Sequence, residues 1–148
     1  MVDILHRIGV KDSTPEKVYE AMTTLDGLAG WWSDDTVGKP NEVGGTVEFR
    51  FVPGNIYMKV VELTPSTHVL WEVVDEPDEW VGTNVSWEIK QEDDYTIVLF
   101  SHLGWREATE FMHHCSTKWA TFLMSLKSLL ETGTGSPSPR DVPISNWH

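Results

Sequence analysis

The feature that most constrains the fold is a long amphipathic stretch near the end of the chain, residues 106–131. Its apolar residues recur at intervals of three and four, at Ala108, Phe111, Met112, Cys115, Trp119, Phe122, Leu123, Leu126, Leu129 and Leu130. This spacing predicts a helix with one broad apolar face and one polar face. Most of the preceding chain has the pattern of strands, so we expect the apolar face to pack against a sheet.

Six segments before this helix alternate apolar and polar residues, which is typical of half-buried β-strands. They cover roughly residues 4–10, 47–51, 57–63, 69–73, 85–89 and 95–103. Residues 38–45 are predicted to be a loop, and Pro53-Gly54-Asn55 a turn.

The segment after the first strand carries the signals of a short helix. Ser13 and Glu16 have the spacing of a capping box, and Pro15 suits the first helical turn. Gly27 and Gly30 interrupt the pattern, which predicts a second short helical piece. We therefore expect an α+β fold with one antiparallel sheet of about six strands, two short helices and the long C-terminal helix packed across the sheet.

The length and composition indicate one globular domain. We expect the chain of 148 residues to form a single domain over residues 1–133, followed by a flexible tail, residues 134–148, rich in Ser, Pro and Gly. The formal net charge of -12 disfavours nucleic acid and anionic membrane surfaces as partners. A single cysteine, Cys115, excludes an intrachain disulfide, and no signal peptide or membrane span is recognisable, so a cytoplasmic location is expected.

Large aromatic residues occupy many of the positions predicted to face the helix. This inward set from the strands and the helix comprises Phe49, Phe51, Trp71, Trp87, Phe100, Trp119 and Phe122. The rings either fill the interior completely or line a cavity for a flat apolar ligand. Trp32 follows Trp31 directly, and adjacent residues cannot both face one core, so one of the pair is expected at the cavity mouth, where it contacts a ligand or anchors the loop.

Two histidines, His6 and His102, fall on the inward parity of the first and last predicted strands. If these strands pair, the two imidazoles are near neighbours that could orient a polar ligand group or act as acid and base. The alternative is that they are hydrogen-bonded structural histidines. A register slip of one residue would turn His6 outward.

The run His113-His114-Cys115 suggests a metal site, but helical geometry argues against it. Consecutive helix positions are about 100° apart, so three in a row cannot converge on one ion. Cys115 is expected in the core and both histidines on the surface. No nucleophile elbow, glycine-rich phosphate loop or zinc spacing is present. We therefore predict no metal and no cofactor, and the sequence identifies no catalytic residue.

Several short motifs occur in a characteristic order along about 130 residues. They are His6-Arg7-Ile8, Ser13-Thr14-Pro15-Glu16-Lys17-Val18-Tyr19, Trp31-Trp32, Gly44-Gly45 before Phe49, Val61-Glu62-Leu63-Thr64-Pro65 before Trp71, and the helix segment from Trp119 to Gly133. This order resembles the helix-grip (START-like, SRPBCC) superfamily and, within it, the domains similar to the activator of heat-shock-chaperone ATPase.

The resemblance implies a curved antiparallel sheet that grips the C-terminal helix, with a cavity between them. It does not imply one function, because its members include ligand carriers, hormone receptors, polyketide cyclases and chaperone activators. We expect a small hydrophobic or aromatic ligand, with His6, Trp32, His102 and the inward aromatic set as candidate contacts. The alternatives are a polyketide cyclase or dehydratase-like enzyme that uses the same cavity, and a chaperone-interacting module. The activators use an additional N-terminal domain, and this chain begins almost at its first strand, so we expect the chaperone role to be the weaker alternative. A homodimer is the assembly that we consider.

Overall fold

The structure is a computed structural model that describes residues 1–51 and 54–148. The turn predicted at Pro53-Gly54-Asn55 therefore lies partly outside the described residues.

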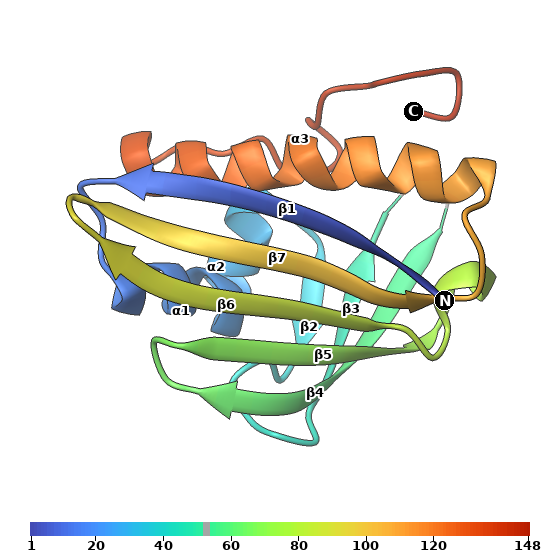
Figure 1. The fold of residues 1–148 in the computed structure, drawn as a ribbon, viewed down its shortest axis with the longest axis horizontal. Coiled ribbons are helices and arrows are strands. Elements are labelled where there is room, and N and C mark those ends of the chain that lie inside the picture. Colours follow the sequence, from blue (N-terminus) through green and yellow to red (C-terminus); the bar gives the residue numbers. More distant parts are fainter. Residues whose placement is uncertain (52–53) are drawn as a thin grey trace.

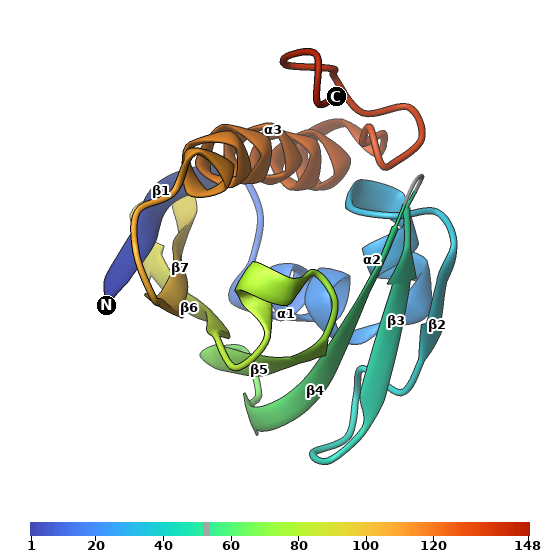
Figure 2. The same cartoon turned by 90° about the vertical axis from the view of Figure 1, so that its right-hand side faces the viewer.

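Seven strands form one antiparallel sheet in the order β1-β7-β6-β5-β4-β3-β2. Their bounds are β1 Val2–Lys11, β2 Thr36–Gly38, β3 Thr46–Arg50, β4 Asn55–Thr64, β5 His68–Asp75, β6 Asn84–Glu92 and β7 Tyr95–Trp105. The sheet curves around the long helix α3, Glu110–Thr132, which lies across its concave side (Figures 1 and 2). This is the helix-grip α+β fold that the sequence predicts.

The sheet has one strand more than the predicted six. The additional strand, β2, has only three residues and pairs with β3 at the edge of the sheet. Three residues are too few to show a period of two, and sequence alternation therefore could not reveal it. The predicted loop, residues 38–45, overlaps β2 by one residue, because Gly38 is the last residue of that strand.

Two short helices, α1 (Pro15–Thr23) and α2 (Leu25–Trp31), follow β1 as predicted. The predicted capping box at Ser13 is wrong by one residue. Thr14 is the N-cap, because its side chain accepts a hydrogen bond from the Lys17 amide at 3.3 Å. Pro15 then occupies the first helical position, where its missing N–H costs nothing.

The long helix α3 begins at Glu110, four residues later than predicted. Thr109 is its N-cap, and Gly133, with a φ of 88°, ends it in the left-handed conformation. The C-terminal half of α3 is fixed to β1, because Lys127 Nζ donates to the Gly9 carbonyl and Glu131 accepts from the Lys11 amide. The N-terminal half is left to contact a different part of the molecule.

The tail segment, residues 134–148, was expected to be flexible, and the structure places it against the domain. The segment leaves α3, passes beside α2 and returns along the outer side of α3 (Figure 2). Ser138 forms an isolated bridge with Ser33. The segment therefore contributes to the surface on which the candidate site lies.

Candidate functional site

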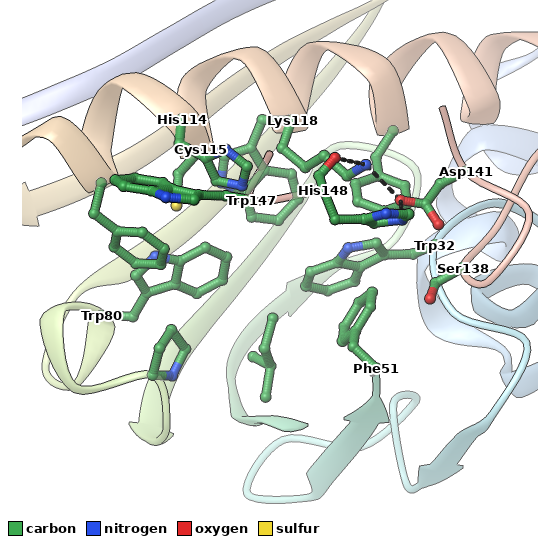
Figure 3. Close-up of a pocket in the computed structure, with 15 residues that line it drawn as sticks. Trp32, Phe51, Trp80, His114, Cys115, Lys118, Ser138, Asp141, Trp147 and His148 are labelled. Carbon is green, nitrogen blue, oxygen red and sulfur yellow. Dashed lines mark hydrogen bonds and ion pairs between the residues drawn. The ribbon is translucent and has the colours of Figure 1, made fainter. Parts of the chain in front are cut away.

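A cavity of about 190 Å³ lies beneath the N-terminal half of α3. Its walls come from α3, the segment after α2, the facing ends of β3 and β4, the loop that contains the short 3-10 helix η1 (Asp78–Trp80), and the tail segment. Figure 3 shows Trp80 and Asp141 on opposite sides of this space, with α3 above them.

Four of the sequence-predicted ligand contacts line this cavity: Trp32, Phe51, Trp119 and Phe122. Trp32 lies between the others, with ring centroids 4.9 Å from Trp119, 5.7 Å from Phe51 and 6.4 Å from Phe122. The structure thus assigns the two adjacent tryptophans different roles. Trp32 lines the cavity, whereas Trp31 is fixed in the core by its indole N–H, which donates to the Ala21 carbonyl at 2.8 Å.

The other predicted contacts lie away from this cavity. They are His6, Phe49, Trp71, Trp87, Phe100 and His102. The four aromatic rings of this group are fully buried and pack on one another and on the tryptophans of α2 and α3. Trp87 and Phe100, for example, have centroids 4.9 Å apart. The deeper part of the space between sheet and helix is therefore filled by side chains, and the opening is confined to one side.

His102 is a structural histidine in a fully buried hydrogen-bond chain. Trp119 Nε1 donates to its Nδ1 at 3.1 Å, and because an indole N–H can only donate, the imidazole proton is on Nε2. Nε2 then donates to Thr83 Oγ1 at 2.8 Å, and the hydroxyl donates to the Trp80 carbonyl at 2.5 Å. Burial lowers the pKa of His102 to about 3, so the ring is neutral.

His6 has the inward orientation that the alternation predicts. β1 pairs with β7 so that Ile4 lies opposite His102 and His6 opposite Phe100. His6 Nε2 lies 3.1 Å from the Ser116 carbonyl on α3 and 3.3 Å from its hydroxyl. The two histidines therefore lie two positions apart on one face, as the predicted pairing requires, but His6 contacts the helix and not the cavity.

Cys115 is buried, as predicted, and lies on the cavity wall. Burial raises the pKa of its thiol to about 12, although the nearby Trp80 indole N–H counteracts part of this rise. A thiol with this pKa is not ionised at neutral pH and is therefore a poor nucleophile.

His114 is partly buried and lines the cavity, which its predicted surface position on α3 did not indicate. Its ring lies 5.6 Å from that of Trp147, which folds over it from the tail segment. Burial, followed by the charges of Lys118 and His148, lowers the pKa of His114. Helical phase correctly turned His114 away from the sheet but gave no sign that the tail would cover it.

Further lining residues were not identified from the sequence: Ile56, Pro77, Trp80, Phe111, Lys118, Ser138, Asp141, Trp147 and His148. Only Phe111 belongs to the periodic apolar stripe. The others lie in short loops, at a strand start, on the polar side of α3 or in the tail, where no period marks an inward residue.

Two buried polar atoms on the cavity walls have no hydrogen bond of good geometry within the described residues: Asp141 Oδ1, an acceptor, and Trp80 Nε1, a donor that faces the weakly accepting thiol of Cys115. An unpartnered buried polar atom costs roughly 1–3 kcal/mol. The cavity therefore offers aromatic surface for an apolar ring and one unpartnered polar atom at each side. Within residues 1–51 and 54–148, no three His, Cys, Asp or Glu side chains form a group that could hold a metal ion.

Comparison with known proteins assigns the family. Residues 12–131 match the family described as Activator of Hsp90 ATPase homolog 1-like protein, AHSA1. This chain belongs to the AHSA1 family. It is therefore a START-like domain of the SRPBCC type. A search of curated proteins found no match.

Solved structures have the same fold. The Aha1 dimer from Colwellia psychrerythraea is 46% identical, with a TM-score of 0.85, and the match covers 91% of this chain and 100% of that chain. The protein SSP2350 from Staphylococcus saprophyticus is 18% identical, with a TM-score of 0.76 and coverage of 90% and 95%. CalU16 from Micromonospora echinospora is 20% identical, with a TM-score of 0.73 and coverage of 93% and 77%. The last two show a shared fold alone.

None of the helices in the described part of the chain is long and apolar enough to cross a membrane.

Proposed function

We propose that this protein binds a small aromatic or hydrophobic molecule in the cavity beneath α3. The observation that carries the proposal is the cavity of about 190 Å³ whose walls include the indoles of Trp32, Trp80 and Trp119. An apolar cavity of about 150 Å³ holds benzene, so this one suits a ligand of one or two fused rings. The unpartnered Trp80 N–H favours a ligand with a hydrogen-bond acceptor at its edge.

The expected affinity is modest. A two-ring ligand that buries about 250 Å² of apolar surface gains about 6 kcal/mol at about 25 cal/mol per Å². Association costs offset part of this gain, and a net gain of about 4–5.5 kcal/mol corresponds to a dissociation constant of roughly 0.1–1 mM for a ligand with no polar contacts. A cognate ligand that also satisfies the Trp80 donor should bind more tightly.

A matched pair of substitutions at Cys115 tests the proposal. Cys115→Leu fills part of the cavity from its α3 wall, whereas Cys115→Ala keeps the space open and is also compatible with the helix. We expect Cys115→Leu to weaken the binding of indole, measured by titration calorimetry, by at least about tenfold. Cys115→Ala should bind indole as the unmodified protein does. Equal affinity of both variants for indole would contradict the proposed site.

Binding is favoured over acid–base catalysis because both ring nitrogens of His102 are occupied by protein partners. A polyketide cyclase or dehydratase-like activity would need titratable groups that are free to transfer protons to a substrate. Among the described cavity residues, Lys118 is paired with Asp141, and His148 lies 3.5 Å from the same carboxylate, which leaves His114 as a single candidate where acid and base catalysis would need a pair.

Assembly as a homodimer is a second proposal, since the 46% identical Colwellia protein is described as a dimer. The family description also makes a chaperone-interacting module a candidate. Stimulation of Hsp90 ATPase by the purified protein would support that role, and unchanged ATPase activity would remove it. We place the protein in the cytoplasm, because its one cysteine is free and buried.

A further inference from the structure

The tail segment consists of a fixed stem and a loosely held end. The stem, residues 136–140, is tied to the domain by its backbone. The Ser138 amide donates to the Trp32 carbonyl at 2.7 Å, and the Ser138 carbonyl accepts from the Asp34 amide at 3.1 Å. Earlier in the stem, the Ser136 amide donates to Ser125 Oγ at 2.7 Å. These contacts fix the point at which the remaining residues begin.

The end of the tail, residues 141–148, is held by one side chain of α3. Lys118 Nζ lies 2.5 Å from Asp141 Oδ2, 2.7 Å from the Val142 carbonyl oxygen and 3.2 Å from the main-chain oxygen of His148. An ammonium group has three N–H donors, so Lys118 is fully used by these three acceptors. Within the described residues, every polar contact between residues 142–148 and the domain preceding the tail passes through Lys118.

The pair at the centre of this contact is shielded from water. The side chain of Lys118 is 15% exposed and that of Asp141 is 4% exposed. His148 Nε2 also lies 3.5 Å from Asp141 Oδ2. Trp147, in contrast, is 48% exposed and Val142 is 58% exposed, so the apolar side chains at the end of the tail are only partly buried.

The same residues form the outer wall of the cavity. Asp141, Trp147 and His148 line it together with His114 and Lys118 (Figure 3). Rotation of residues 141–148 about the stem would remove three side chains from this wall at once. It would also expose the Lys118 and Asp141 charges to water, which hydrates both and offsets the loss of their contact.

We propose that residues 141–148 are the lid of the cavity and that the Lys118–Asp141 pair is its latch. This inference rests on the proposed ligand binding and adds a structure that regulates access to the cavity. With the lid closed, the cavity admits one or two fused rings. With the lid open, it becomes a groove between α3 and the facing ends of β3 and β4 that admits a larger aromatic molecule.

The test compares two probes, indole and the larger N-phenyl-1-naphthylamine, on full-length variants. Lys118→Met removes the cation of the latch, and Asp141→Asn removes its negative charge. Lys127→Met is the control, since Lys127 makes the same kind of contacts on the same helix but away from the cavity, to Gly9, Glu131 and the Tyr95 ring. Circular dichroism checks that each variant is folded.

A lid that is mostly closed lowers the apparent affinity for a ligand that needs the open state by the open fraction. We therefore expect both latch variants to bind N-phenyl-1-naphthylamine at least about tenfold more tightly than the unmodified protein. They should also release indole faster, whereas Lys127→Met should change neither quantity. Equal behaviour of all four proteins toward both probes would overturn the lid.

Hydrogen exchange separates failure of the lid from failure of the proposed function. Absence of indole binding to the unmodified protein would overturn the proposed function. In that case, faster amide exchange of residues 142–148 in Lys118→Met than in Lys127→Met would still support the latch. Unchanged exchange would overturn it.

Discussion

His102 shows how one buried residue connects the sheet, η1 and α3. Its two ring nitrogens join the Trp119 indole to Thr83 and, through Thr83, to the backbone of η1. These hydrogen bonds position Trp80 and Trp119, which both line the cavity. The histidine therefore supports the site without contacting a ligand.

Replacement of His102 by Asn tests this supporting role. Asn keeps an acceptor near the position of Nδ1 but cannot reach Thr83, so the buried Thr83 hydroxyl loses the N–H donor of His102 and keeps only its bond to the Trp80 carbonyl. We expect a loss of about 2–3 kcal/mol in the free energy of unfolding, measured by urea denaturation. Indole affinity should fall only because Trp80 and Trp119 are held less firmly, since His102 itself does not line the cavity. A variant as stable as the unmodified protein would show that the chain is not a structural support.

The pH dependence of stability tests the neutral state of His102. Above pH 6.5 the ring is neutral in both folded and unfolded protein. Below pH 6.5 His102 becomes protonated in the unfolded state, but in the folded state it stays neutral down to its pKa of about 3. The free energy of unfolding therefore falls as the pH falls. The slope from this residue is about 1.4 kcal/mol per pH unit. His102→Asn should show a correspondingly smaller slope between pH 6 and pH 4, and an unchanged slope would contradict a buried neutral ring.

At the scale of elements, α3 is divided into two functional halves. Its C-terminal half is bonded to β1 through Lys127 and Glu131, while its N-terminal half carries the cavity wall and the latch. Ser125 joins α3 to both α2 and the tail stem, because its Oγ donates to the Trp31 carbonyl and accepts from the Ser136 amide.

Gly135, directly before the stem, lies close to α2. A Cβ at this position would lie 2.3 Å from the Gly30 carbonyl oxygen, so Gly135→Ala should displace the stem. At Gly133 a Cβ would meet no atom within 4 Å, and only its φ of 88° opposes a side chain, at a cost of about 1 kcal/mol. We expect chymotrypsin to cleave at Trp147 faster in Gly135→Ala than in Gly133→Ala. Equal cleavage rates would show that the stem does not hold the lid.

The sequence predicted the elements whose apolar residues repeat at a regular spacing over many positions. It did not predict contacts between residues that belong to no such pattern. The phase of α3 correctly turned Trp119 and Phe122 toward the sheet. The latch joins Lys118 on the polar side of α3 to Asp141 in a segment that composition describes as flexible. Nothing local marks such a pair, because it depends on the path of the chain after Gly133. The deeper aromatic residues had the correct parity, but parity alone could not distinguish a filled interior from a cavity.

At the scale of the whole molecule, the net charge of -12 opposes association of two copies. If the proposed homodimer forms, added salt should screen this repulsion and increase the dimer fraction between about 20 and 200 mM NaCl. Sedimentation velocity over a range of protein concentrations measures this fraction. A single monomeric species under all conditions would contradict the proposed dimer.

The indole N–H signals of the tryptophans report directly on whether the cavity beneath α3 binds a small aromatic molecule. Trp80 Nε1 lies on the cavity wall without a partner, whereas Trp31 Nε1 is bonded to the Ala21 carbonyl away from it. In an NMR titration with a small aromatic ligand such as indole, the Trp80 Nε1–H signal should shift and saturate while that of Trp31 stays in place. A Trp80 signal that does not move at saturating ligand, or that moves only together with Trp31, would contradict the account.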